Sequence, residues 1–179
     1  QQEIFFLLVV ASSVNFFFAA FEFLLPFSNR LYGIGGAYAT ILTMGAIGSI
    51  IGALLASKIK AGVYNLLILL ALTGVGVFMM GLPLPTFLSF SGNLVCELFM
   101  TIFNIHFFTQ VQTKVEGEYL GRVLSTIFTL AILFMSIAIG FMTVLPSVHL
   151  SSFLIIGSGV IVLSCFSLIY VRSHFKKEL

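Results

Sequence analysis

The sequence predicts an all-α membrane protein of six transmembrane helices, and three observations predict it. Of the 179 residues, 60% are hydrophobic and only 8% are charged, whereas about a quarter of the residues in soluble domains are charged. Six stretches are long and apolar enough to cross the roughly 30 Å hydrocarbon core of a bilayer as helices. The basic residues also gather on one side of the membrane if all six stretches cross it.

Turn-forming residues separate the six spans. The predicted spans are Ile4–Leu25, Ala37–Ser57, Val63–Leu82, Phe87–Val111, Val123–Leu145 and Ser152–Val171. The expected breaks contain Pro26 with Gly33, Gly35 and Gly36, then Ser57 to Gly62, then Pro83 with Pro85, and Pro146 before the last span. The longest polar loop is expected from Lys114 to Arg122.

The basic residues predict the orientation of the chain in the membrane. Seven of them fall on one side, namely Lys58, Lys60, Lys114, Arg122, Arg172, Lys176 and Lys177, and only Arg30 falls on the other. By the positive-inside rule both ends face the cytoplasm, which predicts a multi-pass protein of the cytoplasmic membrane. The chain opens at Gln1 without the basic and small-residue pattern of a signal peptide, so we expect further chain before it.

Two spans carry polar side chains along one face when residues are placed at 100° intervals. In the first span the stripe contains Ser12, Asn15, Ala19 and Glu22, and in the fourth it contains Ser89, Asn93, Glu97, Thr101 and Asn104. The rest of both spans is mainly apolar, so we expect the two stripes to border a shared water-filled cavity. The alternative is that these groups form hydrogen bonds that hold helices together.

The second and fifth spans carry small residues along one face. The second aligns Gly45, Gly48, Ser49, Gly52 and Ala56, and the fifth aligns Ser125, Thr129, Ser136, Gly140 and Thr143. Small side chains let helices approach closely in a membrane, so these faces predict packing surfaces that slide against a further helix layer. The third and sixth spans show scattered glycines and no polar face, which predicts a peripheral position.

Helix character therefore repeats after every third span. Spans one and four are polar, spans two and five have a small-residue face, and spans three and six are plain. Internal repeats of this kind are typical of secondary transporters. The pattern predicts one six-helix bundle over residues 1–179, built from a three-helix repeat at 1–84 and a second at 85–179.

Glu97 is the candidate site residue with the clearest chemical reason. It lies near the middle of the fourth span, where an acidic residue costs about 2.5–3.5 kcal/mol. A carboxyl group there needs a proton or a partner, which suits a residue that binds protons or a cationic substrate; the alternative is a neutral Glu in a helix contact. The other candidates for contact with substrate or protons are Asn93, Thr101, Asn104, Asn15 and Glu22.

For the histidines and cysteines we expect structural roles and no part in the site. His106 lies about 180° around the helix from Glu97, so we expect it in a helix contact, with His149 and His174 in a loop and the tail. Cys96 and Cys165 lack metal or redox spacing and are expected to be buried. The aromatic residues Phe16, Phe17, Phe18 and Phe21 suit a large apolar substrate, although the favoured interpretation is that they face lipid.

Arg122 is expected to open the fifth helix, where its cation meets the positive end of the helix dipole. A contact with a carboxylate such as Glu116 or Glu118, or a gating contact, would offset this placement. The alternative is that Arg122 only sets the topology. Arg122 is therefore a candidate for a contact in a cytoplasmic gate.

The same stretch resembles a known family. Residues Gln112-Thr-Lys-Val-Glu-Gly-Glu118-Tyr-Leu-Gly121-Arg122-Val123 resemble the loop between the tenth and eleventh helices of major facilitator superfamily exporters, in the macrolide-efflux and enterobactin-exporter branch. That loop typically has a Gln, an acidic residue and then Gly-Arg-Val, although Glu116 and Gly117 stand where the family commonly has proline. The resemblance thus implies a cytoplasmic gate or loop site whose candidate residues are Gln112, Glu118, Gly121 and Arg122. The stretch Gly36-Ala-Tyr38 through Gly45, Gly48 and Gly52 resembles the family's eighth helix.

This resemblance implies the C-terminal half of a twelve-helix fold, whose seventh and tenth helices line a central cavity. Those helices correspond to the first and fourth spans, which already carry the polar stripes. The implied activity is export of drugs or small metabolites by alternating access and proton exchange, with an N-terminal six-helix half, the lipid bilayer, a small-molecule substrate and protons as partners.

Other functions are weighed against this one. A permease subunit of an ATP-driven pump, or a membrane scaffold that transports nothing, is the alternative. An intramembrane enzyme is disfavoured because the sequence shows no nucleophile with a base at useful spacing and no paired Asp. No metal cluster or cofactor motif is apparent, and a net charge of +2 without a basic run argues against nucleic acid.

Overall fold

The computed structural model describes residues 2–60, 62–145 and 147–174, and these are mainly helical. The helices are α1 (Gln2–Leu24), α2 (Ser28–Tyr32), α3 (Ala37–Ala56), α4 (Val63–Gly81), α5 (Thr86–Lys114), α6 (Gly117–Val144) and α7 (Ser151–His174), with a 3-10 turn η1 (Leu25–Phe27) after α1. Within the described residues, six helical segments are long and apolar enough to cross a membrane. The predicted all-α class and the count of six spans are confirmed.

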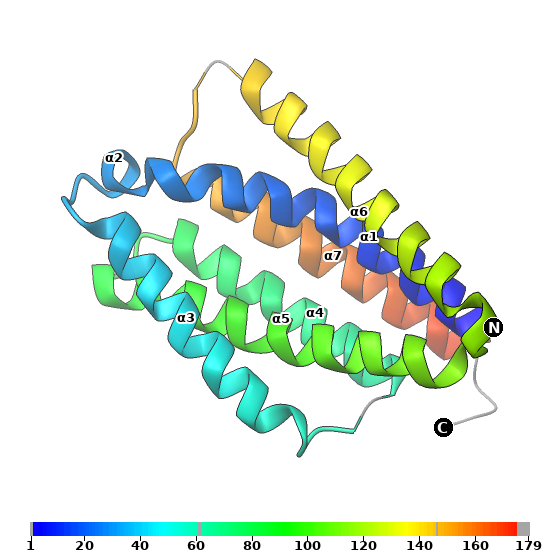
Figure 1. The fold of residues 1–179 in the computed structure, drawn as a ribbon. Helices are drawn as coiled ribbons and strands as arrows, with labels where there is room; N and C mark the ends of the chain where they lie inside the picture. Colours follow the sequence, from blue (N-terminus) through cyan, green and yellow to red (C-terminus); the bar gives the residue numbers. More distant parts are fainter. Residues whose placement is uncertain (1, 61, 146, 175–179) are drawn as a thin grey trace.

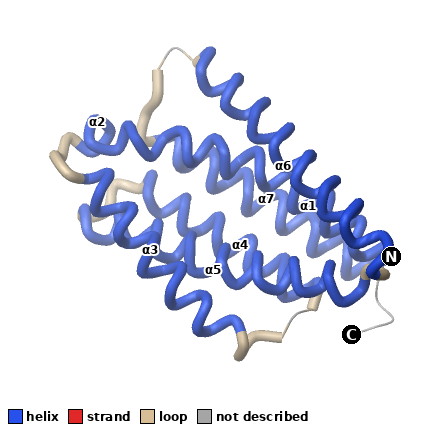
Figure 2. The backbone as a smooth tube through the Cα atoms, in the orientation of Figure 1, coloured by secondary structure: helices blue, strands red, loops and turns tan. Residues whose placement is uncertain are grey.

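The six long helices form a row of neighbours that bends back on itself. Going along the row, α6 packs on α1, α1 on α7, α7 on α4, α4 on α5, and α5 on α3. Figure 1 shows α6 and α3 as the two outer members of this row, and Figure 2 shows that only short loops connect the helices. The helices α1 and α5 face each other across the inside of the bend, and this arrangement positions the site described below.

Successive spans run in alternating directions, so the connections gather at two ends of the bundle. The start of α1 and the end of α7 lie at the same end, opposite to α2 (Figure 1). The described basic residues at that end are Lys58, Lys60, Lys114, Arg122 and Arg172, and Arg30 on α2 lies at the other. Pro146, Lys176 and Lys177 lie outside the described residues.

Pro26 ends α1, as predicted, but the chain stays helical for a few more residues through η1 and α2. The turn into α3 then uses Gly33 and Gly36, whose φ angles of 66° and 84° suit glycine. The Tyr32 hydroxyl donates a 2.6 Å hydrogen bond to the carbonyl of Met80 and so ties this turn to the end of α4.

Glycines bring the central helices into close contact. Gly48 on α3 lies directly against the backbone carbonyl of Leu94 on α5, and a Cβ at Gly76 on α4 would lie 2.6 Å from the carbonyl oxygen of Gly92 on α5. The packing role predicted for Gly45, Gly48 and Gly52 is confirmed within this chain. Because α5 occupies this face, the idea that it slides against another half is wrong for α3.

Two predictions about helix surfaces are wrong within this chain, and a third stays a prediction. No described atom lies within 4 Å of a Cβ built at Gly140, so packing of Gly140 against another half stays a prediction. The third and sixth spans, α4 and α7, are not peripheral within this chain. The α4 helix packs against α5 and α7 and buries residues such as Leu66, Leu70 and Met80, and α7 packs against α4 and α1. Cys165 is exposed on the surface of α7, whereas Cys96 is buried as expected.

The connection between α5 and α6 is also shorter than predicted. Both helices extend into the charged stretch, so that only Val115 and Glu116 separate them. Glu118 stands in the first turn of α6, and Arg122 lies further along that helix instead of opening it. A carboxylate in the first turn suits the positive end of the helix dipole, so the unfavourable placement expected for Arg122 does not arise. His174, expected in the tail, is the last residue of α7.

Candidate functional site between α1, α5 and α6

The polar stripes of α1 and α5 meet at a cavity of about 380 Å³, closed on its third side by α6. The polar lining residues are Ser12, Asn15 and Glu22 from α1, with Glu97 and Asn104 from α5. The shared cavity predicted from the stripes is therefore present. Cavities that hold a drug-sized ligand have volumes of about 300–1,000 Å³, so this one is large enough for a small molecule.

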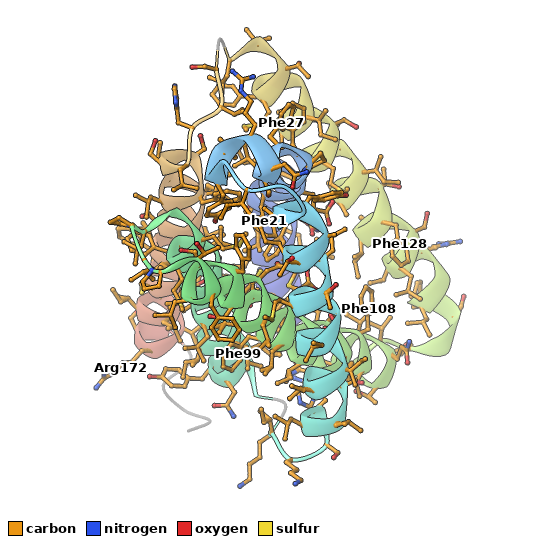
Figure 3. The ribbon with its side chains drawn as sticks, turned by 90° about the vertical axis from the view of Figure 1, so that its left-hand side faces the viewer. Phe21, Phe27, Phe99, Phe108, Phe128 and Arg172 are labelled. Carbon is orange, nitrogen blue, oxygen red and sulfur yellow. The ribbon has the colours of Figure 1, made fainter. Side chains whose placement is uncertain are left out.

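The remaining wall of this first cavity is apolar, and five of its twelve residues are aromatic. Its ring-bearing residues are Phe18 from α1, Phe103, Phe107 and Phe108 from α5, and Phe128 from α6. The rings of Phe108 and Phe128 stack with centroids 5.9 Å apart and planes 24° apart, which joins α5 to α6 where the two helices otherwise make little contact (Figure 3).

Phe18 and Phe21 correct the expectation that the aromatic cluster of α1 faces lipid. Phe18 is buried and lines the cavity, and Phe21 lies in the interior, where it packs edge-on against Phe153 at 5.9 Å (Figure 3). The alternative interpretation, that aromatic residues of this cluster suit an apolar substrate, fits Phe18. Phe16 and Phe17 are half-buried.

A second cavity of about 410 Å³ lies between α1, α3 and α5. Glu22 and Glu97 line both cavities. The first extends to Phe107 on α5, toward the end of the bundle with most basic residues, and the second extends to Tyr38 at the start of α3, toward the opposite end. The two carboxyl groups therefore lie between spaces that lead in opposite directions along the bundle.

Glu97 is held by two residues of α3. The Ser49 hydroxyl donates a 3.1 Å hydrogen bond to Oε2 of Glu97. Gly45 leaves room for the Glu97 side chain, because a Cβ there would lie 3.1 Å from Cγ of Glu97. The described residues that line the two cavities include no basic side chain, so neither carboxyl group has a cationic partner in either lining.

Asn93 lies one helical turn before Glu97 and is 2% exposed. Its Nδ2 donates a 2.8 Å hydrogen bond to the carbonyl of Ile41, which fixes the orientation of the amide. Among the described residues, nothing donates a hydrogen bond to its Oδ1. Asn93 lines the second cavity, but its Oδ1 is itself enclosed by the protein.

Some predicted site residues lie elsewhere. Thr101 is half-buried and lines neither cavity, so its contact with a substrate stays a prediction. His106 is buried away from both cavities, as expected for a helix contact. The gate candidates Gln112, Glu118, Gly121 and Arg122 are exposed around the junction of α5 and α6 and line neither cavity, so a gating role for them stays a prediction.

Ser49 is the site residue that the sequence interpretation placed wrongly. The small-residue pattern predicts only a packing role for it, whereas its hydroxyl contacts Glu97. Its position one turn after Gly45 is a partial signal, since a hydroxyl on a close-packed glycine face can donate to an acceptor on the partner helix or to the carbonyl one turn earlier in its own helix.

The lining predicts which positions of α5 react with water-soluble reagents. In a variant with Cys165 replaced by serine, Asn104→Cys should be modified by a charged methanethiosulfonate reagent faster than Thr101→Cys, because only Asn104 lines a cavity. The measurement is the rate of modification in membranes, read by mass spectrometry. Equal rates at the two positions would show that the cavity is closed to water or that α5 is rotated.

Comparison with models of protein families, with curated protein sequences and with solved structures finds no match to this chain. Its chemistry is therefore inferred from its own residues.

Proposed function

We propose that this chain is the C-terminal half of a secondary transporter of the major facilitator type. It exports drugs or small metabolites across the cytoplasmic membrane by alternating access, coupled to proton exchange, with both ends of the chain in the cytoplasm. The observation that carries the proposal is the pair of glutamates, Glu22 and Glu97, on two membrane-spanning helices that face the same two cavities. Ionisable residues inside a membrane are costly and typically mark substrate or proton pathways.

The packing of the helices supports an internal repeat. In the predicted repeat α1 corresponds to α5, α3 to α6, and α4 to α7. The contact of α3 with α5 in this scheme corresponds to the contact of α6 with α1, and the contact of α4 with α5 corresponds to the contact of α7 with α1. All four contacts are present. Transporters built from such repeats bind their substrates at the interface between repeats, near the middle of the bilayer.

The exposed surface of α6 supports the proposal that a second six-helix half packs against this chain. It is the least buried of the six spans, and its small-residue face, with Ser125, Thr129, Ser136 and Gly140, is exposed. Small and hydroxyl-bearing residues favour close helix contacts in membranes. In this proposal a second six-helix half covers that face and forms the opposite wall of the cavities.

Export by the complete gene product tests this function. Cells that lack their main exporters and express the gene should accumulate less of at least one compound from a panel of cationic, neutral and anionic dyes and antibiotics. An uncoupler should abolish the difference, because the proton gradient drives the export. Unchanged accumulation across the whole panel, or export that survives the uncoupler and requires ATP, would contradict the proposal; the second result would favour an ATP-driven pump.

A further inference from the structure

The residues that line the two cavities indicate which chemical class of small molecule the site binds. Glu22 and Glu97 are acidic groups shared by both linings, and the described lining residues contain no basic side chain. Ser49 provides a hydrogen bond to one oxygen of Glu97, but a hydroxyl supplies no positive charge. Carboxylates in a membrane interior pair with a cation or become protonated, so the site favours a ligand that brings the missing positive charge.

The carboxyl groups add a second requirement, which is for hydrogen-bond donors. An ionised carboxyl group accepts several hydrogen bonds through its two oxygens, and the Ser49 hydroxyl donates one of them to Oε2 of Glu97. A ligand that bears N–H groups can donate to the other acceptor positions, and such charge-assisted hydrogen bonds are stronger than neutral ones. A quaternary ammonium ion or a bare apolar molecule cannot donate.

The aromatic wall of the first cavity supplies the third requirement. Five phenylalanine rings and two methionines, Met100 and Met135, line the space adjoining the carboxyl groups. Such a wall suits an apolar or aromatic body, and the faces of aromatic rings also attract cations. The volume of about 380 Å³ accommodates a body of two fused rings with a short chain.

We propose that this site binds a protonated amine with an apolar body. The ammonium group lies beside Glu22 and Glu97 and donates hydrogen bonds to their carboxylate oxygens, and the body occupies the first cavity beside Phe18 and Phe128. This inference rests on the proposed function, since it names the class of compound that the transporter carries. By this proposal the site does not bind carboxylates, and it binds neutral compounds and quaternary ammonium ions with lower affinity than primary amines.

Dansylcadaverine and three derivatives test the proposal. It combines a fluorescent aromatic body with a primary amine; the derivatives are the N-acetyl compound (neutral), the trimethylammonium compound (no N–H) and dansyl-6-aminohexanoate (anionic). Binding to the purified complete gene product in detergent is followed by dansyl fluorescence. We expect the amine to bind about 10- to 100-fold more tightly than the N-acetyl compound, as loss of a charged hydrogen bond implies. The trimethylammonium compound should fall between them, and the carboxylate should bind least.

Substitutions test which residues cause the preference for the amine over the N-acetyl compound. Glu97→Gln and Glu22→Gln should each reduce the preference for the amine over the N-acetyl compound, while Glu116→Gln, which removes a carboxylate outside both cavities, should retain it. Unchanged affinity for the N-acetyl compound shows that a variant is folded. If a variant does not fold, the series of four compounds on the unsubstituted protein still decides.

The results separate this inference from the proposed function. Equal binding of the amine and the N-acetyl compound, or tighter binding of the carboxylate, overturns the amine site. Export of neutral or anionic compounds without preference for amines also overturns it and leaves the transporter in place. Selective binding of the amine without export of any compound supports the site and contradicts the transporter.

Discussion

Replacing Gly48 with alanine is expected to destabilise the bundle, although alanine is the better helix former. A Cβ at this position meets the backbone carbonyl oxygen of Leu94 on α5, closer than any real contact allows. Backbone cannot move aside as a flexible side chain can, so α3 and α5 must separate along a contact that also includes Gly52. Overpacking of this kind costs about 1–3 kcal/mol, more than the roughly 1 kcal/mol that alanine gains over glycine in a helix.

Gly140→Ala is the matched control for this change. Gly140 also lies within a membrane-spanning helix, but nothing described lies within 4 Å of a Cβ there. In the 179-residue chain without a second half, only the preference of alanine for helices remains at this position, so we expect unchanged or slightly higher stability. The measurement is the midpoint of thermal unfolding of each variant of this 179-residue chain, purified in detergent, read from the loss of the monodisperse peak in size-exclusion chromatography. Equal midpoints for the two variants would show that the close contact of α3 with α5 is absent.

The spans could be predicted from the sequence because crossing a bilayer is a local property of length and hydropathy. The predicted and observed bounds of α3 and α4 differ by one residue at one end of each helix. The junction of α5 and α6 was mistaken for a long loop because charged residues such as Lys114 and Glu118 leave the hydrocarbon core. Leaving the core does not end a helix, and both helices continue into the polar stretch.

Membership of the site was harder to predict, because it depends on how each helix is rotated in the bundle. Helical periodicity put Asn93, Thr101 and Asn104 on one stripe, yet Asn104 lines the first cavity, Asn93 lines the second, and Thr101 lines neither. The rotation of α5 is set by where the glycines of α3 and α4 allow close approach, as at Gly76. Such a pairing joins distant parts of the chain, which a single sequence does not reveal.

Glu97→Gln is expected to reduce export by the complete gene product at least about tenfold, the effect of losing one charge-assisted contact of about 1.5 kcal/mol. The substitution keeps the shape of the side chain and an acceptor for the Ser49 hydroxyl. It removes the ability of this position to bind a proton or to balance a cation. The fold should therefore tolerate the change, and we expect expression and membrane insertion to stay at the level of the unsubstituted protein.

The measurement is the initial rate of export of a compound identified in the accumulation panel, in membrane vesicles with an imposed proton gradient. Glu116→Gln serves as the control, because it changes the charge by the same amount at the exposed junction of α5 and α6. Export that stays unchanged in Glu97→Gln would remove this residue from the mechanism. If Glu22→Gln alone then abolished export, the working carboxyl group would be the one on α1.

The double variant Glu22→Gln/Glu97→Gln distinguishes a shared role from two separate ones. Both carboxyl groups line the same two cavities. Residues that act on one ligand or proton show non-additive effects, so the double variant should lose little more than the more severe single variant. Losses that multiply, with each substitution reducing the rate by its own factor, would instead indicate that the two glutamates serve independent steps.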